Sequence, residues 1–229
     1  MSLFAIADLH LSFGVEKPMD IFNGWEGYVE KIEQNWREVV NEDDVVVIVG
    51  DISWGMNLKE AFLDFKFLNE LPGKKILIKG NHDYYFATKG KMDKFFLENG
   101  FNSLNFLFNN SYEYGDYSIC GTRGWANIGD ETGDTKILKR EANRLELSLK
   151  TAAKTPIVFI HYPPILHNGK SEEILEVLYK NNVKVVYYGH LHGKSCEYAV
   201  KGVVDGIKYE FISSDYLNFK LLKVLWILK

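Results

Sequence analysis

The sequence predicts an α/β protein in which at least part of the β-sheet is parallel. Five short runs rich in β-branched and apolar residues are typical of strands, and segments with the apolar spacing of helices lie between them. Strands that alternate with helices along a chain pair in parallel, because each helix serves as a crossover connection. The five predicted strands are Leu3–Ala7, Val45–Val49, Lys75–Ile78, Pro156–Ile160 and Val183–Tyr188.

The helices between these strands are marked by apolar residues three and four positions apart. This spacing is clearest in the first helix, and a serine followed by two glutamates marks the start of the last one. The predicted helices are 25–40, 58–68, 133–150 and 171–180, and short strands joined by turns are predicted over 106–120 and 197–227.

Composition excludes several classes of protein. The chain has 229 residues, of which 46% are apolar and 14% aromatic, so it can bury a large core and is neither disordered nor collagenous. No linker or repeat divides the chain, and we expect a single domain over residues 1–229. The net charge of −4 does not favour nucleic acid as a partner.

Nothing in the sequence resembles a membrane span or a basic, apolar signal peptide. Cys120 and Cys196 form no metal-binding Cys-x-x-Cys pair and suggest no disulfide framework. We therefore expect a cytoplasmic protein. The oligomeric state is not determined by the sequence.

Five of the six histidines lie in the few residues that follow a predicted strand. In open α/β sheets, binding sites form in the crevice beyond the carboxyl ends of the strands. Residues i and i+2 of an extended segment project to the same side, which pairs Asp8 with His10 and His190 with His192. The five segments are Asp8-Leu9-His10, Gly50-Asp51, Gly80-Asn81-His82-Asp83, His161 and Gly189-His190-Leu191-His192.

Together these segments offer the ligand set of a transition-metal site. Imidazole mixed with carboxylate suits Mn, Fe, Zn or Co better than Mg or Ca. The number of ligands is too large for one such ion with an open position and suits two ions that share a bridging carboxylate. The candidate ligands are Asp8, His10, Asp51, Asn81, His161, His190 and His192.

Each segment taken alone also fits a structural role. Asp-x-His after a strand can close a turn, Gly-Asp is a common turn dipeptide, and Asn and Asp often cap loops. Only the occurrence of all five segments in order, each after a strand, favours a metal site.

The same five segments resemble the calcineurin-like metallophosphoesterases, whose pattern is Asp-x-His, Gly-Asp, Gly-Asn-His-Asp/Glu, His and Gly-His-x-His. The resemblance extends from Asp8 to His192. It implies two mixed β-sheets packed as a sandwich flanked by helices, a four-layer αββα fold with a two-metal site at one end. It further implies that Asp8, His10 and His192 hold one metal, that Asn81, His161 and His190 hold the other, and that Asp51 bridges both.

The resemblance implies hydrolysis of a phosphoester bond of a small phosphomonoester or phosphodiester by a metal-bridging hydroxide. His82 is expected to assist the leaving group and Asp83 to orient the His82 ring. Manganese is the favoured cofactor for both sites. Two divalent ions, two carboxylates and a hydroxide leave roughly one positive charge to receive a phosphate.

One departure from the pattern of the superfamily narrows the range of expected substrates. The Ser/Thr protein phosphatases of this superfamily extend the second segment to Gly-Asp-x-x-Asp-Arg-Gly, and this chain has Gly50-Asp51-Ile52-Ser53-Trp54-Gly55 instead. Arg123, in a glycine-flanked loop, is then the candidate substrate-binding cation, although it also fits a surface loop residue packed on Trp125. A nuclease or nucleotide pyrophosphatase of the same superfamily is the alternative enzyme, and a non-catalytic binding scaffold is the alternative from another class.

Overall fold

Two β-sheets and five α-helices make up the part of the chain that the computed structural model describes, residues 1–125 and 135–224. The first sheet contains β1 (Leu3–Ile6), β2 (Val45–Val49), β3 (Lys74–Ile78), β4 (Leu104–Phe106) and β13 (Leu222–Lys223). The second contains β5 (Tyr112–Tyr114), β6 (Tyr117–Thr122), β7 (Thr155–Ile160), β10 (Val185–Tyr188), β11 (Gly202–Val204) and β12 (Ile207–Phe211). A separate hairpin joins β8 (Ile165–Leu166) to β9 (Gly169–Lys170).

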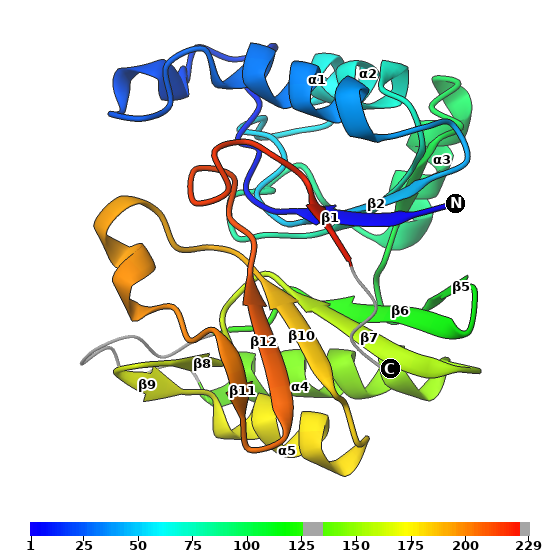
Figure 1. Cartoon of the computed structure of the whole chain (residues 1–229). Helices are drawn as coiled ribbons and strands as arrows, with labels where there is room; N and C mark the ends of the chain where they lie inside the picture. The colour runs from blue at the N-terminus through cyan, green and yellow to red at the C-terminus, as the bar shows by residue number, and fades with distance from the viewer. Residues whose placement is uncertain (126–134, 225–229) are drawn as a thin grey trace.

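The helices lie on the outer sides of the two sheets (Figure 1). The side of the first sheet carries α1 (Tyr28–Val39), α2 (Phe62–Glu70) and α3 (Lys89–Glu98), and the side of the second carries α4 (Thr135–Lys150) and α5 (Glu172–Lys180). Two 3₁₀ helices, η1 (Met19–Ile21) and η2 (Gly193–Tyr198), lie in the loops. The four-layer αββα arrangement with two mixed sheets is the fold that the resemblance implied, and it is confirmed.

Strand order shows why the sheets are mixed. The first sheet runs β13-β1-β2-β3-β4 and the second β11-β12-β10-β7-β6-β5. Strands β1 to β4 pair in parallel, as do β6, β7, β10 and β12, whereas β13, β11 and β5 add antiparallel edges. The parallel centre of each sheet is what the alternation of strands and helices predicted.

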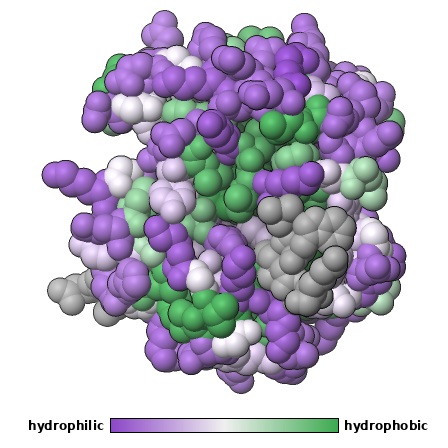
Figure 2. Space-filling model, viewed as in Figure 1, coloured by the Kyte–Doolittle hydropathy of each residue, from purple (hydrophilic) through white to green (hydrophobic). Residues whose placement is uncertain are grey.

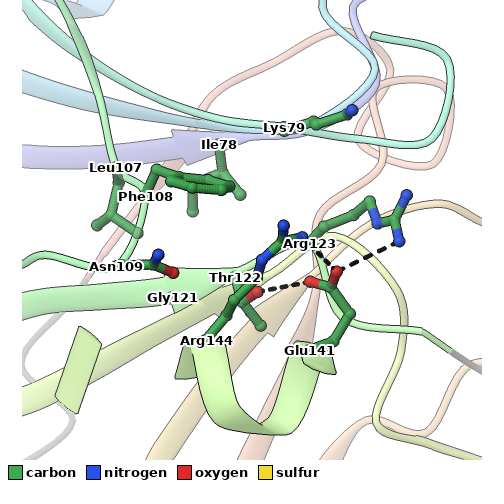
Figure 3. A pocket seen from close by; sticks show the side chains of 10 residues that line it. All are labelled: Ile78, Lys79, Leu107, Phe108, Asn109, Gly121, Thr122, Arg123, Glu141 and Arg144. Atoms are coloured by element: carbon green, nitrogen blue, oxygen red, sulfur yellow. Dashed lines mark hydrogen bonds and ion pairs between the residues drawn. The ribbon is translucent and has the colours of Figure 1, made fainter. Parts of the chain in front are cut away.

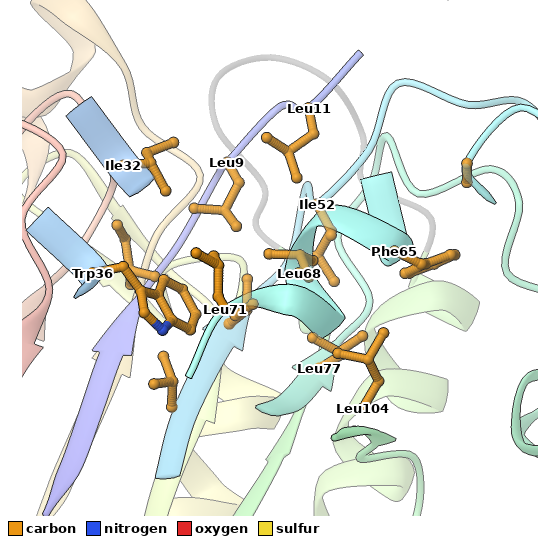
Figure 4. Close-up of a cluster of buried hydrophobic side chains, with 14 of the residues drawn as sticks. Leu9, Leu11, Ile32, Trp36, Ile52, Phe65, Leu68, Leu71, Leu77 and Leu104 are labelled. Atoms are coloured by element: carbon orange, nitrogen blue, oxygen red, sulfur yellow. The ribbon is translucent and has the colours of Figure 1, made fainter. Parts of the chain in front are cut away.

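Alternate side chains of each strand enter different cores. In β1, Leu3 and Ala5 face the second sheet, whereas Phe4 and Ile6 face the helices of their own side. Figure 4 shows part of the outer core, where Leu9, Trp36 and other apolar side chains from helices, strands and loops meet. Complete burial of one such aliphatic side chain stabilises the fold by about 1.5 to 3 kcal/mol.

A short connection joins the two sheets at the end where the site forms. Ala7 pairs in parallel with Ser213, and the backbone amide of Ala7 donates to the Ile212 carbonyl at 2.9 Å. The amide of Asp8 donates to the Gly50 carbonyl at 3.0 Å. The carboxyl ends of strands from both sheets therefore meet at one edge of the sandwich.

The predicted elements agree with the structure to within a few residues, but helix α3, the β8–β9 hairpin and η1 were not predicted. All five predicted strands are present, and the first and last predicted helices are α1 and α5. Helix α3 was not predicted, because Gly90 and the charged residues around its buried Met92 and Phe96 weaken the apolar pattern. Residues 133–134 and 225–227 of the predicted segments lie outside the described residues.

The surface seen in Figure 2 is mostly hydrophilic over the upper helical layer, and apolar residues show below it at the height of the sheets. Within the described residues, no helix is both long enough and apolar enough to span a membrane.

Candidate metal centre

Two groups of side chains with metal-binding atoms lie at the edge where the strand ends meet. Cluster A consists of Asp8, His10 and His192, and cluster B of Asp51, His161 and His190. Within each cluster, one candidate ligand atom from every residue lies within 4.8 Å of the others. The structure thus brings together six of the seven ligands that the resemblance implied, in two groups.

Cluster A joins residues that are far apart in the sequence. The Nε2 atoms of His10 and His192 are 3.3 Å apart, and His192 Nε2 is 3.8 Å from Asp8 Oδ1. His192 Nδ1 lies 3.0 Å from Asp215 Oδ1, and because this carboxylate carries no proton to give, the imidazole nitrogen donates. When His192 is neutral, its Nε2 therefore presents a lone pair toward Asp8 and His10.

The seventh expected ligand, Asn81, lies beside cluster B. His161 Nδ1 donates to the Val49 carbonyl at 3.1 Å, so the Nε2 of the neutral ring is left as an acceptor. That Nε2 lies 2.7 Å from Asn81 Oδ1 and 3.6 Å from Asp51 Oδ2. Lone pairs that converge in this way repel one another, and a bound cation would relieve the repulsion.

Asp51 lies between the clusters. Its Oδ2 is 3.6 Å from His161 Nε2 of cluster B and 3.9 Å from His10 Nε2 of cluster A. Its other oxygen, Oδ1, accepts a 2.8 Å hydrogen bond from the backbone amide of His82. One carboxylate oxygen therefore faces the ligand atoms of both clusters.

The loops can approach this closely only because glycines precede the site residues. A Cβ atom on Gly80 would lie 2.2 Å from Asp51 Oδ1, and one on Gly189 would lie 2.4 Å from Asp8 Oδ2. A Cβ on Gly50, whose φ is +84°, would lie 2.4 Å from the Nδ1 of His161. The close approach that the sequence predicted at these glycines is present.

The backbone of the site itself is strained. Four site residues adopt left-handed φ angles between 46° and 75°: Asp8, His10, Asp51 and His190. A non-glycine residue in an unfavourable region costs about 1 to 3 kcal/mol, and such positions gather at functional sites. The surrounding strand pairing holds these residues in place.

Burial sets the charge states of the ligands. It raises the pKa of Asp8 to about 7, with the charge of Asp51 adding to the rise, and it also raises the pKa of Asp51. Burial lowers the pKa of His161 to about 3 and that of His190 to about 2, and it holds the pKa of His10 well below its usual range. The imidazoles of His10, His161 and His190 are thus neutral, as metal binding requires.

An outer ring of polar residues orients cluster A. Besides binding His192, Asp215 accepts a 2.9 Å hydrogen bond from the Gly193 amide through Oδ2. Asp8 Oδ2 accepts from Ser213 Oγ at 2.8 Å and from the His190 amide at 2.9 Å. The sequence analysis missed Asp215 and Ser213, although Ser213-Ser214-Asp215 follows β12 as the other site segments follow their strands.

His82 lies at the mouth of the site, half-buried between aromatic rings. Its ring centroid is 4.5 Å from that of Trp54, 5.8 Å from His10 and 6.2 Å from Tyr84. Trp54 also stacks on His10, with ring centroids 4.8 Å apart and the planes 22° apart. The imidazole thus faces the site beside cluster A.

Asp83 lies elsewhere than expected. Its Oδ1 accepts from the amides of Ile52 and Ser53 at 2.8 and 3.2 Å, and its Oδ2 accepts from the Gly80 amide at 2.7 Å. Among the described residues, the hydrogen-bond donors to Asp83 are thus backbone amides and not the His82 ring, which we expected as its partner. These backbone amides satisfy the fully buried carboxylate, so Asp83 joins the Asp51 loop to the Asn81 loop.

Arg123 is not a free surface residue. Its side chain is 15% exposed, its Nη2 donates to Glu141 Oε1 at 3.3 Å, and its guanidinium lies 5.1 Å from the Trp125 ring centre. The Arg123 carbonyl accepts from the amide of Tyr162, whose ring packs on His190 with centroids 4.0 Å apart. The positive charge of Arg123 is among the causes that lower the pKa of His161.

Comparison with known proteins agrees with this geometry. A sequence profile of the family described as calcineurin-like phosphoesterase matches residues 1–194, which include every residue of both clusters. The chain belongs to the calcineurin-like phosphoesterase family. Members of this family are metal-dependent phosphoesterases, and the two His/Asp clusters are consistent with a dinuclear metal site.

Individual relatives are more distant. Gene 66 protein of Mycobacterium phage L5 is 38% identical over 80 residues, which cover 34% of this chain and only 37% of that protein. A protein of unknown function from Aquifex aeolicus, AQ665, has a TM-score of 0.55 and 19% identity, with 97% of this chain and 95% of that chain covered. Phosphopantetheinyl hydrolase from Mycobacterium tuberculosis has a TM-score of 0.56 and 15% identity, with 98% and 95% covered. These two structures share the fold.

Proposed function

We propose that this chain hydrolyses a phosphoester bond of a small phosphorylated substrate, with two divalent transition-metal ions bound between its two sheets. Asp8, His10 and His192 would hold one ion, Asn81, His161 and His190 the other, and Asp51 both. The observation that carries the proposal is the position of Asp51 Oδ2, 3.9 Å from His10 Nε2 and 3.6 Å from His161 Nε2. A carboxylate oxygen between two histidine groups is suited to bridge two ions.

The residues present fit such ions. Asp8 Oδ1 is buried and has no hydrogen-bond partner among the described residues, a state that costs about 1 to 3 kcal/mol unless a cation satisfies it. The mixed imidazole, carboxylate and amide donors suit Mn, Fe, Zn or Co, and we propose manganese. Two such ions, when bound, polarise phosphoryl oxygens and lower the pKa of a water molecule toward neutrality.

His82 would assist the departing oxygen. Its ring lies beside cluster A at the open side of the site, and its backbone amide holds Asp51 in place. An imidazole within reach of the leaving oxygen can donate a hydrogen bond or a proton to it. We propose Asp83 as a positioning residue that holds the His82 loop through backbone amides.

Arg123 would bind the substrate on the cluster B side. A guanidinium held by Glu141 and Trp125 is fixed in orientation, which favours recognition of a phosphate oxygen. We propose that residues 1–229 act as one domain in the cytoplasm, in line with the free thiols of Cys120 and Cys196. The net charge of −4 supports a small substrate rather than nucleic acid.

The test compares hydrolysis of p-nitrophenyl phosphate and bis-p-nitrophenyl phosphate in Mn²⁺, with Asp51→Asn as the control for contaminating phosphatase. We expect turnover of at least one substrate by the wild type and none by the variant. A monoester preference would favour sugar or nucleotide phosphates, and a diester preference would favour the nuclease or pyrophosphatase alternative. Bound metal without turnover of either compound would favour a binding scaffold and contradict the proposal.

A further inference from the structure

A pocket next to cluster B opens between the ends of β3 and β6 and helix α4 (Figure 3). Lys79 on its wall directly precedes Gly80 and Asn81, and Thr122 on another wall accepts a backbone hydrogen bond from His161 at 3.4 Å. Strand β6 pairs in parallel with β7, which His161 follows, so the pocket adjoins strand ends that carry residues of cluster B.

The charges in this pocket are unbalanced. Glu141 is fully buried and accepts hydrogen bonds from Thr122 Oγ1 at 2.9 Å, Arg123 Nη2 at 3.3 Å and Arg144 Nη1 at 2.6 Å. Figure 3 shows these three side chains converging on the carboxylate. Lys79 adds a third cation to the lining and, among the described residues, forms no ion pair with a carboxylate. Three cations and one anion thus line the pocket, in a chain whose net charge is −4.

The cations are held rather than mobile. The Arg123 guanidinium lies 5.1 Å from the Trp125 ring centre, the Arg144 guanidinium 4.8 Å from that of Phe108, and Lys79 Nζ 5.4 Å from that of Phe86. Arg123 Nε is buried and has no hydrogen-bond partner among the described residues. A structural ion pair would need only one of these arginines, whereas an anion would satisfy both the unused donor and the surplus positive charge.

We propose that this cation pocket, formed by Lys79, Arg123 and Arg144 around Glu141, binds a second phosphate group of the substrate. The inference rests on the proposed function and narrows its substrate class to phosphoesters that carry two phosphoryl groups, as a diphosphate or a bisphosphate. The guanidinium fork matches the oxygens of a phosphate in two parallel hydrogen bonds. Glu141 is then a positioning residue that aligns both arginines.

The test measures kcat/KM for two matched pairs in Mn²⁺: adenosine 5′-diphosphate against adenosine 5′-monophosphate, and fructose 1,6-bisphosphate against fructose 6-phosphate. We expect the wild type to prefer the doubly phosphorylated member of at least one pair. Arg144→Gln should reduce that preference about tenfold, the loss typical of one charged hydrogen bond, and Arg144→Lys should reduce it less. Arg140→Gln is the matched control, because Arg140 approaches the same carboxylate at 3.7 Å but is 54% exposed and outside the pocket lining.

The outcomes separate the two proposals. The same preparations are assayed with p-nitrophenyl phosphate, and thermal unfolding confirms that each variant is folded. Turnover of p-nitrophenyl phosphate without a preference for the second phosphate, or a preference that Arg144→Gln leaves intact, would overturn the cation pocket alone. Absence of turnover for every substrate by metal-loaded wild type would contradict the proposed function instead.

Discussion

Clusters A and B contain similar ligands but differ in how they are enclosed. His161 of cluster B is fully buried and its Nδ1 donates to a backbone carbonyl, whereas the His192 side chain of cluster A is 29% exposed and donates to Asp215. Burial is the largest cause that lowers the pKa of His161 to about 3. For His192 burial also acts to lower the pKa, but the hydrogen bond to Asp215 and the charge of Asp8 outweigh it and raise the pKa above its usual value.

The comparison shows how one fold can give two neighbouring sites different affinities. Cluster B has neutral imidazoles at every ordinary pH, so its ligands are ready to bind a cation. Cluster A must release a proton from His192 before that ring can bind, so its affinity depends on pH and on Asp215. We therefore expect cluster B to fill first and cluster A to be the exchangeable site.

The largest expected effect comes from the residue that the clusters share. Asp51→Asn removes the charge that faces both sites, and we expect it to lower activity at least about a thousandfold, or about 4 kcal/mol, and to reduce bound metal. Activity assays and elemental analysis of the dialysed protein measure the two effects. Full metal content in an inactive variant would contradict the bridging position of Asp51.

The second-largest expected effect is a loss of rate without a loss of bound metal. His82→Ala removes a ring that lies outside the two ligand groups, and we expect normal metal content with a rate about a hundredfold lower. The loss should be greater for an alkyl phosphate than for p-nitrophenyl phosphate, because a poor leaving group depends more on protonation. Equal rates for the variant and the wild type on the alkyl phosphate would rule out this role.

A third variant should weaken metal binding at cluster A and leave cluster B unchanged. Asp215→Ala removes the hydrogen bond to His192, and we expect metal affinity at cluster A to fall about 10- to 100-fold while cluster B is unchanged. Manganese titration followed by electron paramagnetic resonance resolves the two binding steps. Asp205→Asn, an exposed acidic position, is the control. Two binding steps weakened to the same extent would contradict the assignment of Asp215 to cluster A.

The smallest effect is a pH dependence confined to cluster A. The raised pKa of His192 means that this ring gains its proton at a higher pH than an ordinary imidazole does, and each further lost pH unit should then weaken metal binding at cluster A by at most about tenfold. The pKa values of His161, about 3, and His190, about 2, keep cluster B neutral there. Metal content after dialysis from about pH 8 to 5.5 should show cluster A emptying first, with activity falling below about pH 6. Loss of metal from both clusters at the same pH would contradict the expected difference between them.

Much of the site could be predicted because its signal is local. Each strand is a short apolar run, and a glycine or an acidic residue with histidine follows it within a few positions. Parallel strands place these segments at one edge, so Asp8, Asp51 and His161 could be expected together without coordinates. The glycines before Asp51, Asn81 and His190 were informative for the same reason, since only a residue without a Cβ fits there.

The tertiary structure alone decided the partners of these residues. Asp215 meets His192 across 23 positions and Ser213 meets Asp8 across 205, and no local pattern encodes which loops become neighbours. The same holds for the contact between Glu141 and Arg123, which forms only when α4 packs on β6, whereas Arg144 reaches Glu141 from one turn along the same helix. Sequence determined which residues can bind a metal or an anion. Packing determined their surroundings, and thereby their charge states, because burial and hydrogen bonding depend on the whole fold.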